Sequence, residues 1–462
     1  MSFLAQKKRE NPPLPSTSMS ILKKQCESKQ SCKENAVTKL SMISSQEISV
    51  VDIVRMATET MSQCISQNSD CVAYDSSFLL QSEKSKDLEL VLSLQAAAIS
   101  FSKQQFDQAR NRLSFCQRCA SPEGTPLQRL IYYFAEALQE GISAERGEVS
   151  LQEAPKESQK CPAFEKAFDI LLAASSDFND RMPFCPVSQF TAIQALLENV
   201  ASARKIHVVD FGIKSGTQWP ILMQALINRN NCPLEYLKIT VVGSSKEMLE
   251  KIGNELSSFA ASLKIPFAFK MVISDLKNLD KHFFELAADE TLAVYSELRL
   301  ATLLAWPHHL VSVLETIKKL RPKVIVTIEV DSNTNAPIFL DRFNASLSLS
   351  AVMFDSLEVC MKQNRKSREI IESVMLRQSI KYLITSKGEE SMHRQESVGF
   401  WRTLFRKLGM FEIALSNCAL YQATLTVKSN PRWGSCTVEC NGKGMTVGWK
   451  GTPVHFLTVW KC

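Results

Sequence analysis

The spacing of hydrophobic positions predicts helices in the part of the chain that follows residue 85. Between residues 88 and 113 apolar side chains recur every three or four positions, which is typical of amphipathic helices that pack on one another. These positions are Leu88, Leu92, Ala96, Ile99, Phe106, Ala109 and Leu113. A turn with Pro and Gly at 121–126 separates them from a further predicted helix at 127–141. We therefore expect a helical hairpin or bundle, then a polar loop at 143–162 and more helix at 163–203.

The hydrophobic period changes at residue 205, where short β-branched runs begin to alternate with helical patterns. Strands are predicted at 205–212, 237–243, 267–272, 291–295 and 323–330, with helices at 219–228 and 247–263. Apolar strands that alternate with helices indicate an α/β fold with a doubly wound, largely parallel sheet. Long helices follow residue 339, and shorter strands at 421–427, 435–438 and 446–449 are expected to form an antiparallel edge of the same sheet.

Residues 1–80 differ from the rest in being rich in Ser, Lys, Gln and Pro, which predicts a flexible tail. One apolar-periodic piece at 48–61 is compatible with a helix. The chain as a whole, with 462 residues, 45% hydrophobic and 22% charged, has the composition of a globular protein. Because the sequence has no long uncharged apolar run and no signal-peptide core, we expect an intracellular protein with reduced cysteines and no membrane contact. Its 14 cysteines lack the paired spacing of structural zinc sites, so no metal is predicted.

Charge is unevenly distributed, although the formal net charge is only +6. Residues 1–35 hold seven Lys and Arg against three Glu (+4), residues 36–360 hold 31 against 38 acidic (−7), and residues 361–462 hold 16 against seven (+9). The basic C-terminal part is the place to look for phosphate contacts, and the acidic part is expected to face proteins. The candidate DNA contact is Lys362, Arg365, Lys366 and Arg368, for which a solvated helix face is the alternative. A candidate nuclear import signal is Lys7, Lys8 and Arg9.

The strongest chemical candidate is the turn after the first strand, Asp210-Phe211-Gly212-Ile213-Lys214-Ser215-Gly216. Rossmann-like sheets place a Gly-rich turn here against a nucleotide, and a methyltransferase that binds S-adenosylmethionine would have Asp-x-Gly-x-Gly-x-Gly. Lys214 stands at the middle glycine position, and the second strand ends without the acid that accepts ribose hydroxyls. We therefore predict a retained fold that has lost the reaction, with a small-molecule methyltransferase as the alternative.

Two further patterns in the sequence bear on function. His207 and Asp210 are three residues apart on a predicted strand, so their side chains point to opposite faces and do not form a proton-transfer pair. No catalytic residue is therefore predicted. Residues 300–304 match the LxxLL pattern of a docking helix, a match that also arises by chance in leucine-rich helices.

Five motifs in order resemble the GRAS family of plant regulatory proteins over about residues 85–462. Ile206, His207, Val208, Val209 and Asp210 resemble the VHIID motif, and Trp460 keeps the Trp of the SAW motif. On this resemblance a tail at 1–80 precedes a GRAS domain at 85–462, which consists of leucine repeat I (85–147), a VHIID region (168–235), leucine repeat II (247–279), a PFYRE region (290–384) and a SAW region (387–462). Residues 449–453 are similar to the DELLA-like branch, although the tail contains no Asp-Glu-Leu-Leu-Ala stretch.

The resemblance implies an α-helical cap on a Rossmann-like, methyltransferase-like core without a cofactor. It further implies nuclear localisation and control of transcription through transcription factors or other GRAS proteins. A homodimer and direct DNA contact are additional properties that it suggests. The leucine-rich helices of residues 88–142 are then expected to bind the partners.

Overall fold

A computed structural model describes residues 48–66, 83–148, 171, 174–175, 177–385 and 394–462. The chain divides into two compact units, residues 1–92 and 93–462. The described part of the first unit consists of α2 (Val50–Ser66) and the beginning of α3 (Glu83–Ser102). The helix predicted at 48–61 is confirmed by α2. The remainder of the predicted tail, residues 1–47 and 67–80, lies outside the described residues.

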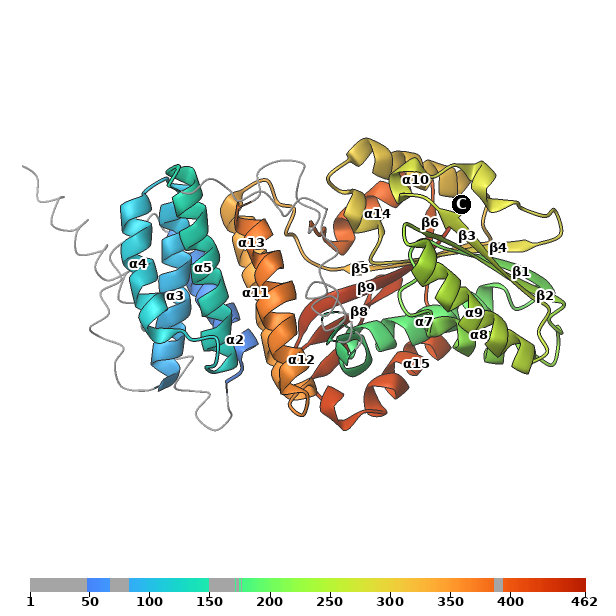
Figure 1. Ribbon diagram of the computed structural model, residues 1–462, viewed down its shortest axis with the longest axis horizontal. Coiled ribbons are helices and arrows are strands. Elements are labelled where there is room, and N and C mark those ends of the chain that lie inside the picture. The colour runs from blue at the N-terminus through green and yellow to red at the C-terminus, as the bar shows by residue number, and fades with distance from the viewer. Residues whose placement is uncertain (1–47, 67–82, 149–170, 172–173, 176, 386–393) are drawn as a thin grey trace, which may run out of the picture. The chain divides into compact units, whose positions relative to one another are not determined.

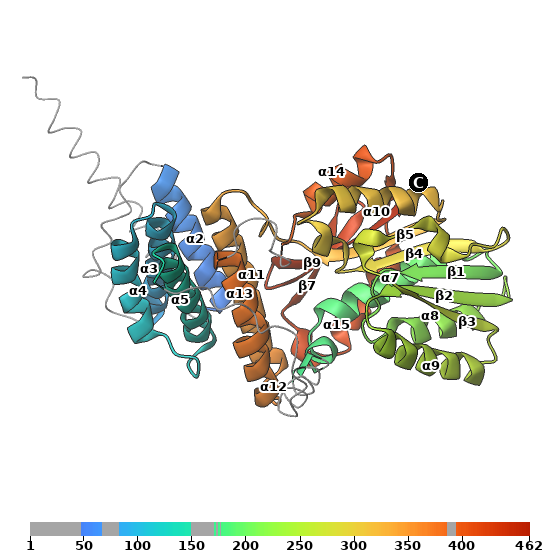
Figure 2. The ribbon, with the colours of Figure 1, turned by 45° about the horizontal axis from the view of Figure 1, so that its top comes forward.

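A helical cap forms one part of the second unit. It is built from α4 (Phe106–Cys119), α5 (Pro126–Glu145), α11 (Phe339–Cys360), α12 (Arg365–Ile370), the π-helical turn η5 (Ile371–Leu376) and α13 (Arg377–Thr385). Helices α5, α11 and α13 lie side by side in both views (Figure 1, Figure 2). Phe134 of α5 meets Phe343 of α11 edge-on, with ring centroids 5.5 Å apart. The cap thus joins residues 106–145 to residues 339–385, which are far apart in the sequence.

Local sequence explains where α5 begins. The Thr125 hydroxyl accepts a hydrogen bond from the backbone N–H of Gln128, and the Gln128 side chain accepts one from the backbone N–H of Thr125. This capping box satisfies two N–H groups that have no partner inside the helix. Pro126 at the first helical position needs no such partner. The predicted helix at 127–141 is therefore confirmed and extends to Glu145.

The core contains a nine-stranded sheet with the order β3-β2-β1-β4-β5-β9-β8-β7, and β6 also pairs with β9. Strands β1 to β5 are parallel, whereas β6 to β9 add antiparallel pairs. The strands are β1 (Lys205–Asp210), β2 (Tyr236–Gly243), β3 (Phe267–Ile273), β4 (Thr291–Glu297), β5 (Val324–Val330), β6 (Phe411–Ile413), β7 (Cys436–Asn441), β8 (Gly444–Trp449) and β9 (Thr452–Lys461). The predicted α/β class, with a mostly parallel sheet and an antiparallel edge, is confirmed.

Helices cover both faces of this sheet. One face carries α7 (Phe184–Asn199), α8 (Gln218–Ile227), α9 (Lys246–Ser262) and α15 (Asn417–Lys428), and the other carries α10 (Pro307–Lys319) and α14 (Val398–Lys407) (Figure 2). On the second face Val209, Val294, Ile325 and Trp460 pack with buried residues of α10 and α14 in one hydrophobic core. The two-sided cover explains why the parallel strands read as continuous apolar runs.

The strand predicted at 421–427 is wrong, because these residues belong to α15. Thr424, Thr426 and Val427 are β-branched and favour a strand locally. The side chains that α15 buries are Ala419, Ala423 and Thr426, which are spaced by four and three residues. Ser416 caps the helix by accepting a hydrogen bond from the backbone N–H of Ala419. The helical period therefore overrides the local preference.

Candidate functional site

Asp210 lies at the carboxyl end of β1 and holds the glycine turn in its conformation. Its side chain is fully buried. Oδ1 accepts a hydrogen bond from the backbone N–H of Gly212 at 3.1 Å, and Oδ2 accepts one from Trp219 Nε1 at 3.1 Å. Burial, together with the neighbouring Glu297 carboxylate, raises the pKa of Asp210 to about 8. The carboxyl group is thus a buried structural anchor that links the turn to α8.

Gly212 lies under the side chain of Arg299, which follows β4. The φ angle of Gly212 is +137°, and a Cβ atom built on it would come within 2.4 Å of Arg299 Cδ and 2.5 Å of its Nε. Arg299 Nε donates a hydrogen bond of 3.1 Å to the carbonyl oxygen of Phe211. The surface that a glycine turn offers to a nucleotide is therefore covered by a side chain of this protein.

Lys214, at the middle glycine position, turns inward to a buried carboxylate. Its Nζ lies 3.5 Å from Glu297 Oε1, at the end of β4. The same carboxylate accepts hydrogen bonds from Tyr295 Oη at 2.8 Å and from Gln189 Nε2 on α7 at 2.9 Å. Glu297 is only 2% exposed, and these donors provide hydrogen-bond partners for its buried oxygens.

The residues at this turn do not fit S-adenosylmethionine. Arg299 covers the first glycine, and the Lys214 side chain fills the place where the motif has a second one. After β2, where a cofactor-binding chain has an acid for the ribose hydroxyls, Ser245 instead caps α9 by accepting a hydrogen bond from the Met248 N–H. The carboxyl ends of β1, β2 and β4 are thus used for contacts within the protein.

Residues 206–210, which resemble the VHIID motif, divide between the two faces of the sheet. His207 Nε2 is 2.8 Å from Thr240 Oγ1, and Nδ1 is 3.3 Å from Glu290 Oε2, which also pairs with Lys238 Nζ at 2.7 Å. Burial and the charge of Lys238 lower the pKa of His207 to about 4, so the ring is neutral. Asp210 contacts Trp219 on the other face, as the strand period predicts. Ile206, Val208 and Val209 are fully buried core residues.

Trp460 of the SAW-like tripeptide is a core residue of β9. Its ring stacks on Phe405 of α14 with centroids 4.7 Å apart, and Nε1 donates a hydrogen bond of 2.9 Å to Thr458 Oγ1. The hydroxyls of Thr458 and Thr327 on β5 are 2.8 Å apart. Thr458 therefore supplies a hydroxyl where the motif has Ser. The stacking of Trp460 on Phe405 packs α14 against the sheet.

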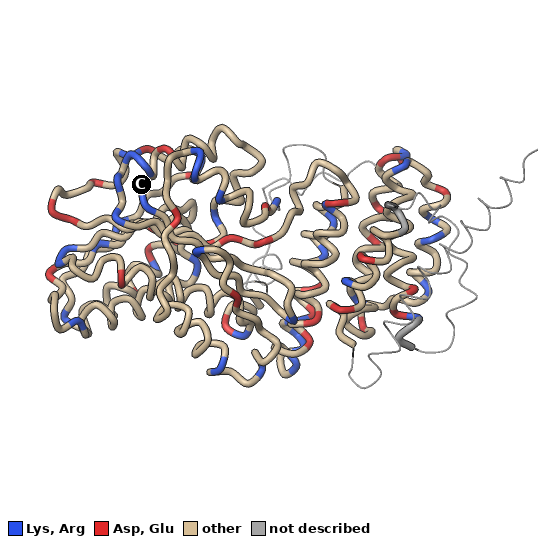
Figure 3. Tube along the Cα trace, turned by 180° about the vertical axis from the view of Figure 1, so that it is seen from behind, with Lys and Arg blue, Asp and Glu red and all other residues tan. Residues whose placement is uncertain are grey.

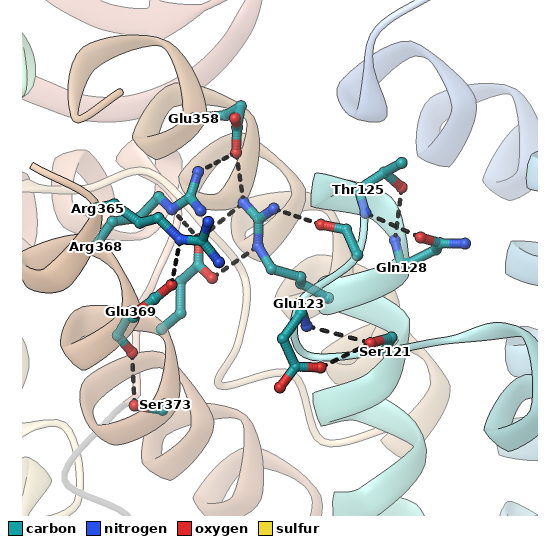
Figure 4. A network of polar contacts seen from close by, with 12 residues as sticks. Ser121, Glu123, Thr125, Gln128, Glu358, Arg365, Arg368, Glu369 and Ser373 are labelled. Carbon is teal, nitrogen blue, oxygen red and sulfur yellow. Dashed lines mark hydrogen bonds and ion pairs between the residues drawn. The ribbon is translucent and has the colours of Figure 1, made fainter. Parts of the chain in front are cut away.

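A buried network of charges joins α5 to the other cap helices (Figure 4). The Arg129 guanidinium donates to both oxygens of Glu372, at 2.8 and 3.1 Å, and to Glu358 Oε2 at 2.8 Å. Its remaining nitrogen donates to the Gly124 carbonyl oxygen at 2.8 Å. Arg129 and Glu372 have side chains that are only 4% and 2% exposed. This network lies at the π-helical turn and was not found from the sequence, because its members are about 240 residues apart.

Two of the four residues of the candidate DNA contact form ion pairs within the protein, and two do not. Arg368 has a side chain that is 11% exposed, and it pairs with Glu358. Arg365 Nε pairs with Glu369 Oε1 at 2.6 Å. Lys362 and Lys366 are exposed, and neither forms an ion pair within the described part of the chain. Arg368 thus belongs to the cap network (Figure 4). Of the four residues, only Lys362 and Lys366 remain exposed without an ion pair in the described part of the chain.

Other candidate positions are explained by the fold. In the LxxLL match at 300–304, Leu300, Leu303 and Leu304 are buried in the core, so they cannot dock into a partner's groove. Cys116 is buried and Cys119 is exposed on α4. Among the described residues, no group of three His, Cys, Asp or Glu side chains could hold a metal ion. Lys7, Lys8 and Arg9 lie outside the described residues.

The fold and this site define a class of protein: a Rossmann-like α/β core with a helical cap, whose glycine turn is filled by the protein's own side chains. A family model described as the GRAS domain family matches residues 90–461. The chain belongs to the GRAS family, a family of plant transcriptional regulators. This confirms the resemblance found in the sequence. No helix in the described ranges has the length and apolar character required to cross a membrane.

Curated relatives and a solved structure agree with this assignment. The DELLA protein DWARF8 of Zea mays is 30% identical over 396 residues, which are 81% of this chain and 61% of that protein. The DELLA protein RGL1 of Arabidopsis thaliana is 32% identical over 300 residues, 63% of this chain and 58% of that protein. A crystal structure of SCL7 in Oryza sativa has a TM-score of 0.71 and 27% identity, covering 80% of this chain and 99% of that one. The chain thus spans about three-fifths of the length of these DELLA proteins.

Proposed function

We propose that this protein is a nuclear regulator of transcription that works as a binding scaffold for transcription factors or other GRAS proteins, and not as an enzyme. The observation that carries the proposal is the filled glycine turn: Arg299 and Lys214 occupy the surface that S-adenosylmethionine would need. A core that does not bind the cofactor would act by binding other proteins. Calorimetry with S-adenosylmethionine tests the alternative of a small-molecule methyltransferase, and saturable binding would support that alternative.

The cap helices are the proposed partner-binding surface, but their leucines do not form it. Leu113, Leu130 and Leu138 are fully buried. The accessible part of α4 is its polar side, with Gln108 and Asn111 one turn apart and exposed. A partner or a second copy of the chain would therefore contact polar positions of α4, while the leucines hold the helix in place.

Charge insertion at these two positions tests the proposal without removing the cap. We expect the Gln108→Arg, Asn111→Arg variant of the full chain to lose capture of transcription factors from plant nuclear extract, or to lose dimers in light scattering. The matched control is Asn254→Arg, Ser257→Arg, which places the same charges on two exposed positions of α9 at the same spacing. Equal capture and assembly by all three proteins would refute the cap as the interface. Equal loss in both variants would refute it as well.

Nuclear localisation and direct DNA contact complete the proposal. Lys7, Lys8 and Arg9 are proposed as the import signal. The exposed Lys362 and Lys366 remain candidates for the DNA contact, since Arg365 and Arg368 are engaged with Glu369 and Glu358. A contact to phosphates weakens steeply as salt increases. If Lys362→Gln, Lys366→Gln leaves the DNA affinity and its salt dependence unchanged, these lysines do not make the contact.

A further inference from the structure

A second basic surface lies at the end of the core where α10, α14 and β9 all terminate. Six of its residues are exposed and Lys461 is half-buried. Figure 3 shows basic positions gathered around the C-terminal end of the trace. The surface, which we call the α10/α14 basic surface, consists of Lys318, Lys319, Arg321, Lys323, Arg406, Lys407 and Lys461.

Contacts between the three elements show that these residues share one end of the core. Lys318 Nζ donates a hydrogen bond of 2.7 Å to the carbonyl oxygen of Leu408, directly after α14. Lys461 on β9 pairs with Phe411 on β6, four residues after Lys407. On the other side of β9, Trp460 is paired with Ile325, two residues after Lys323. Residues from three separate parts of the sequence are thus brought side by side.

Little of this positive charge is neutralised by the protein itself. Glu412 is buried and accepts from Arg402, and it lies 3.6 Å from Arg406. Glu315 is exposed one turn before Lys319 on α10 without an ion pair to it in the described part of the chain. Within the described ranges, ion pairs are also absent for Lys319, Arg321, Lys323, Lys407 and Lys461. The last turns of both helices favour cations, which explains part of the cluster but not Lys323 or Lys461.

The composition of the surface favours a phosphate backbone over a protein. Protein interfaces are depleted in Lys and are centred on apolar or aromatic anchors. Five of these seven residues are Lys, and the one large apolar side chain exposed on α10, α14, β6 and β9 is Phe411, at 68% exposure. Surfaces that bind DNA are instead strongly positive and polar.

We propose that the α10/α14 basic surface binds the phosphate backbone of duplex DNA. This inference rests on the proposed DNA contact. It places the principal site of that contact on the α10/α14 basic surface, around Lys319, Lys323 and Lys407, and not at Lys362 and Lys366. These three lysines are the main neutralising charges. Arg321 has a φ of +51° and lies in the same surface.

The test compares two triple variants of the full chain that carry the same change of charge. The first is Lys319→Gln, Lys323→Gln, Lys407→Gln, in which no ion pair of the described residues is broken. The control is Lys251→Gln, Lys264→Gln, Lys428→Gln, three lysines that are also exposed and form no ion pair among the described residues. Binding of a labelled duplex is measured by fluorescence anisotropy over a range of NaCl concentrations. The first variant is expected to lower the salt slope of the binding constant by about three and to weaken binding at least about tenfold, whereas the control retains the wild-type slope.

Four results would overturn the proposal. Equal weakening by both variants would mean that only net charge matters. Unchanged binding by the first variant, with weaker binding by Lys362→Gln, Lys366→Gln, would assign the contact to those two lysines and leave the proposed function intact. Poly-glutamate that binds as tightly as the duplex, and is lost in the first variant, would assign the surface to an acidic protein segment. Absence of duplex binding by the intact chain would remove both DNA proposals, while capture of transcription factors would still report separately on the scaffold role.

Discussion

The side chain of Arg299 lies against Gly212 so closely that no residue with a Cβ atom fits beneath it. A Cβ at Gly212 would meet Arg299 Cγ at 2.5 Å and Cδ at 2.4 Å. In a cofactor-binding turn this glycine would leave room for a ligand. Here it leaves room for an arginine of the same chain, whose Nε bonds to the Phe211 carbonyl oxygen. A glycine is therefore required although no nucleotide has to approach it.

We expect Gly212→Ala to lower the free energy of unfolding by at least about 2 kcal/mol, because it adds both backbone strain and a steric overlap. Gly451→Ala is the matched control, since its φ is also positive, +76°, but nothing lies within 4 Å of an added Cβ. It should cost about 1 kcal/mol. Urea denaturation gives both values. Combining Gly212→Ala with Arg299→Ala should recover part of the loss, and strictly additive effects would show that the contact is unimportant.

Stability should decrease as pH rises from about 4.5 to about 8, because a buried carboxyl group holds its proton in the folded state. Burial raises the pKa of Glu329 to about 8 from its ordinary value of 4.5, so between these values the folded protein binds more protons than the unfolded chain. Its stabilising contribution is complete below pH 4.5 and is lost as pH rises through about 8. The pKa of Asp210 is also raised to about 8, so its contribution to stability is likewise lost as pH rises.

Glu329→Gln isolates this effect. The glutamine can still accept the hydrogen bond that Glu329 Oε1 receives from the Leu300 N–H at 2.9 Å, and it cannot ionise. We expect the variant to be more stable than the wild type at pH 9 by on the order of 1 kcal/mol or more, with a smaller difference at pH 5. Denaturant midpoints at the two pH values measure this. A variant whose pH profile runs parallel to that of the wild type would exclude Glu329 as the titrating group.

The buried Arg129–Glu372 pair should be costly to break on one side only. Arg129→Met leaves the Glu372 carboxylate, 2% exposed, without its main partner, and we expect a loss of about 3–5 kcal/mol. Arg365→Met is the control, because the exposed pair with Glu369 contributes no more than about 1 kcal/mol. The double variant Arg129→Met, Glu372→Met should be less destabilised than the sum of its single changes. Additivity would mean that the two side chains are not coupled.

Changing Lys7, Lys8 and Arg9 to Ala should redistribute a fluorescent fusion of the full chain from the nucleus to the cytoplasm. Import receptors read short basic runs, and these three residues are the basic run at the beginning of this sequence. Lys23→Ala, Lys24→Ala serves as the control in the same part of the chain. An unchanged nuclear signal in plant cells would show that import depends on another segment or on a partner.

Local periodicity was sufficient to predict most of the core. The alternation of β-branched runs with helical patterns identified β1 to β5, and the antiparallel edge was confirmed in β7 and β8. Strand β9 was not predicted, although it is central in the sheet, and the strand expected at 421–427 is a helix. Both elements depend on tertiary structure. Strand β9 follows a turn in which Lys450 and Gly451 have positive φ angles, and α15 is stabilised as a helix by burial of Ala419 and Ala423.

The candidate site shows the same limit. Lys214 at the middle glycine position and the missing acid after β2 were visible in the sequence, and from them we predicted a turn that has lost its cofactor. Arg299, which covers Gly212, could not be found in this way because it lies 87 residues further along the chain. Arg368 was grouped with Lys366 on charge alone, and only the structure shows that its partner is Glu358. The sequence alone does not show which charged residues form ion pairs within the protein when their partners lie far apart along the chain.

The core keeps the methyltransferase-like fold, while Arg299 and Lys214 close its glycine turn. Isothermal titration calorimetry of the intact chain with S-adenosylmethionine tests it most directly, with a known methyltransferase as positive control. We expect no saturable heat at the highest protein concentration that can be reached. A saturable one-to-one isotherm, abolished by Asp210→Asn, would contradict it.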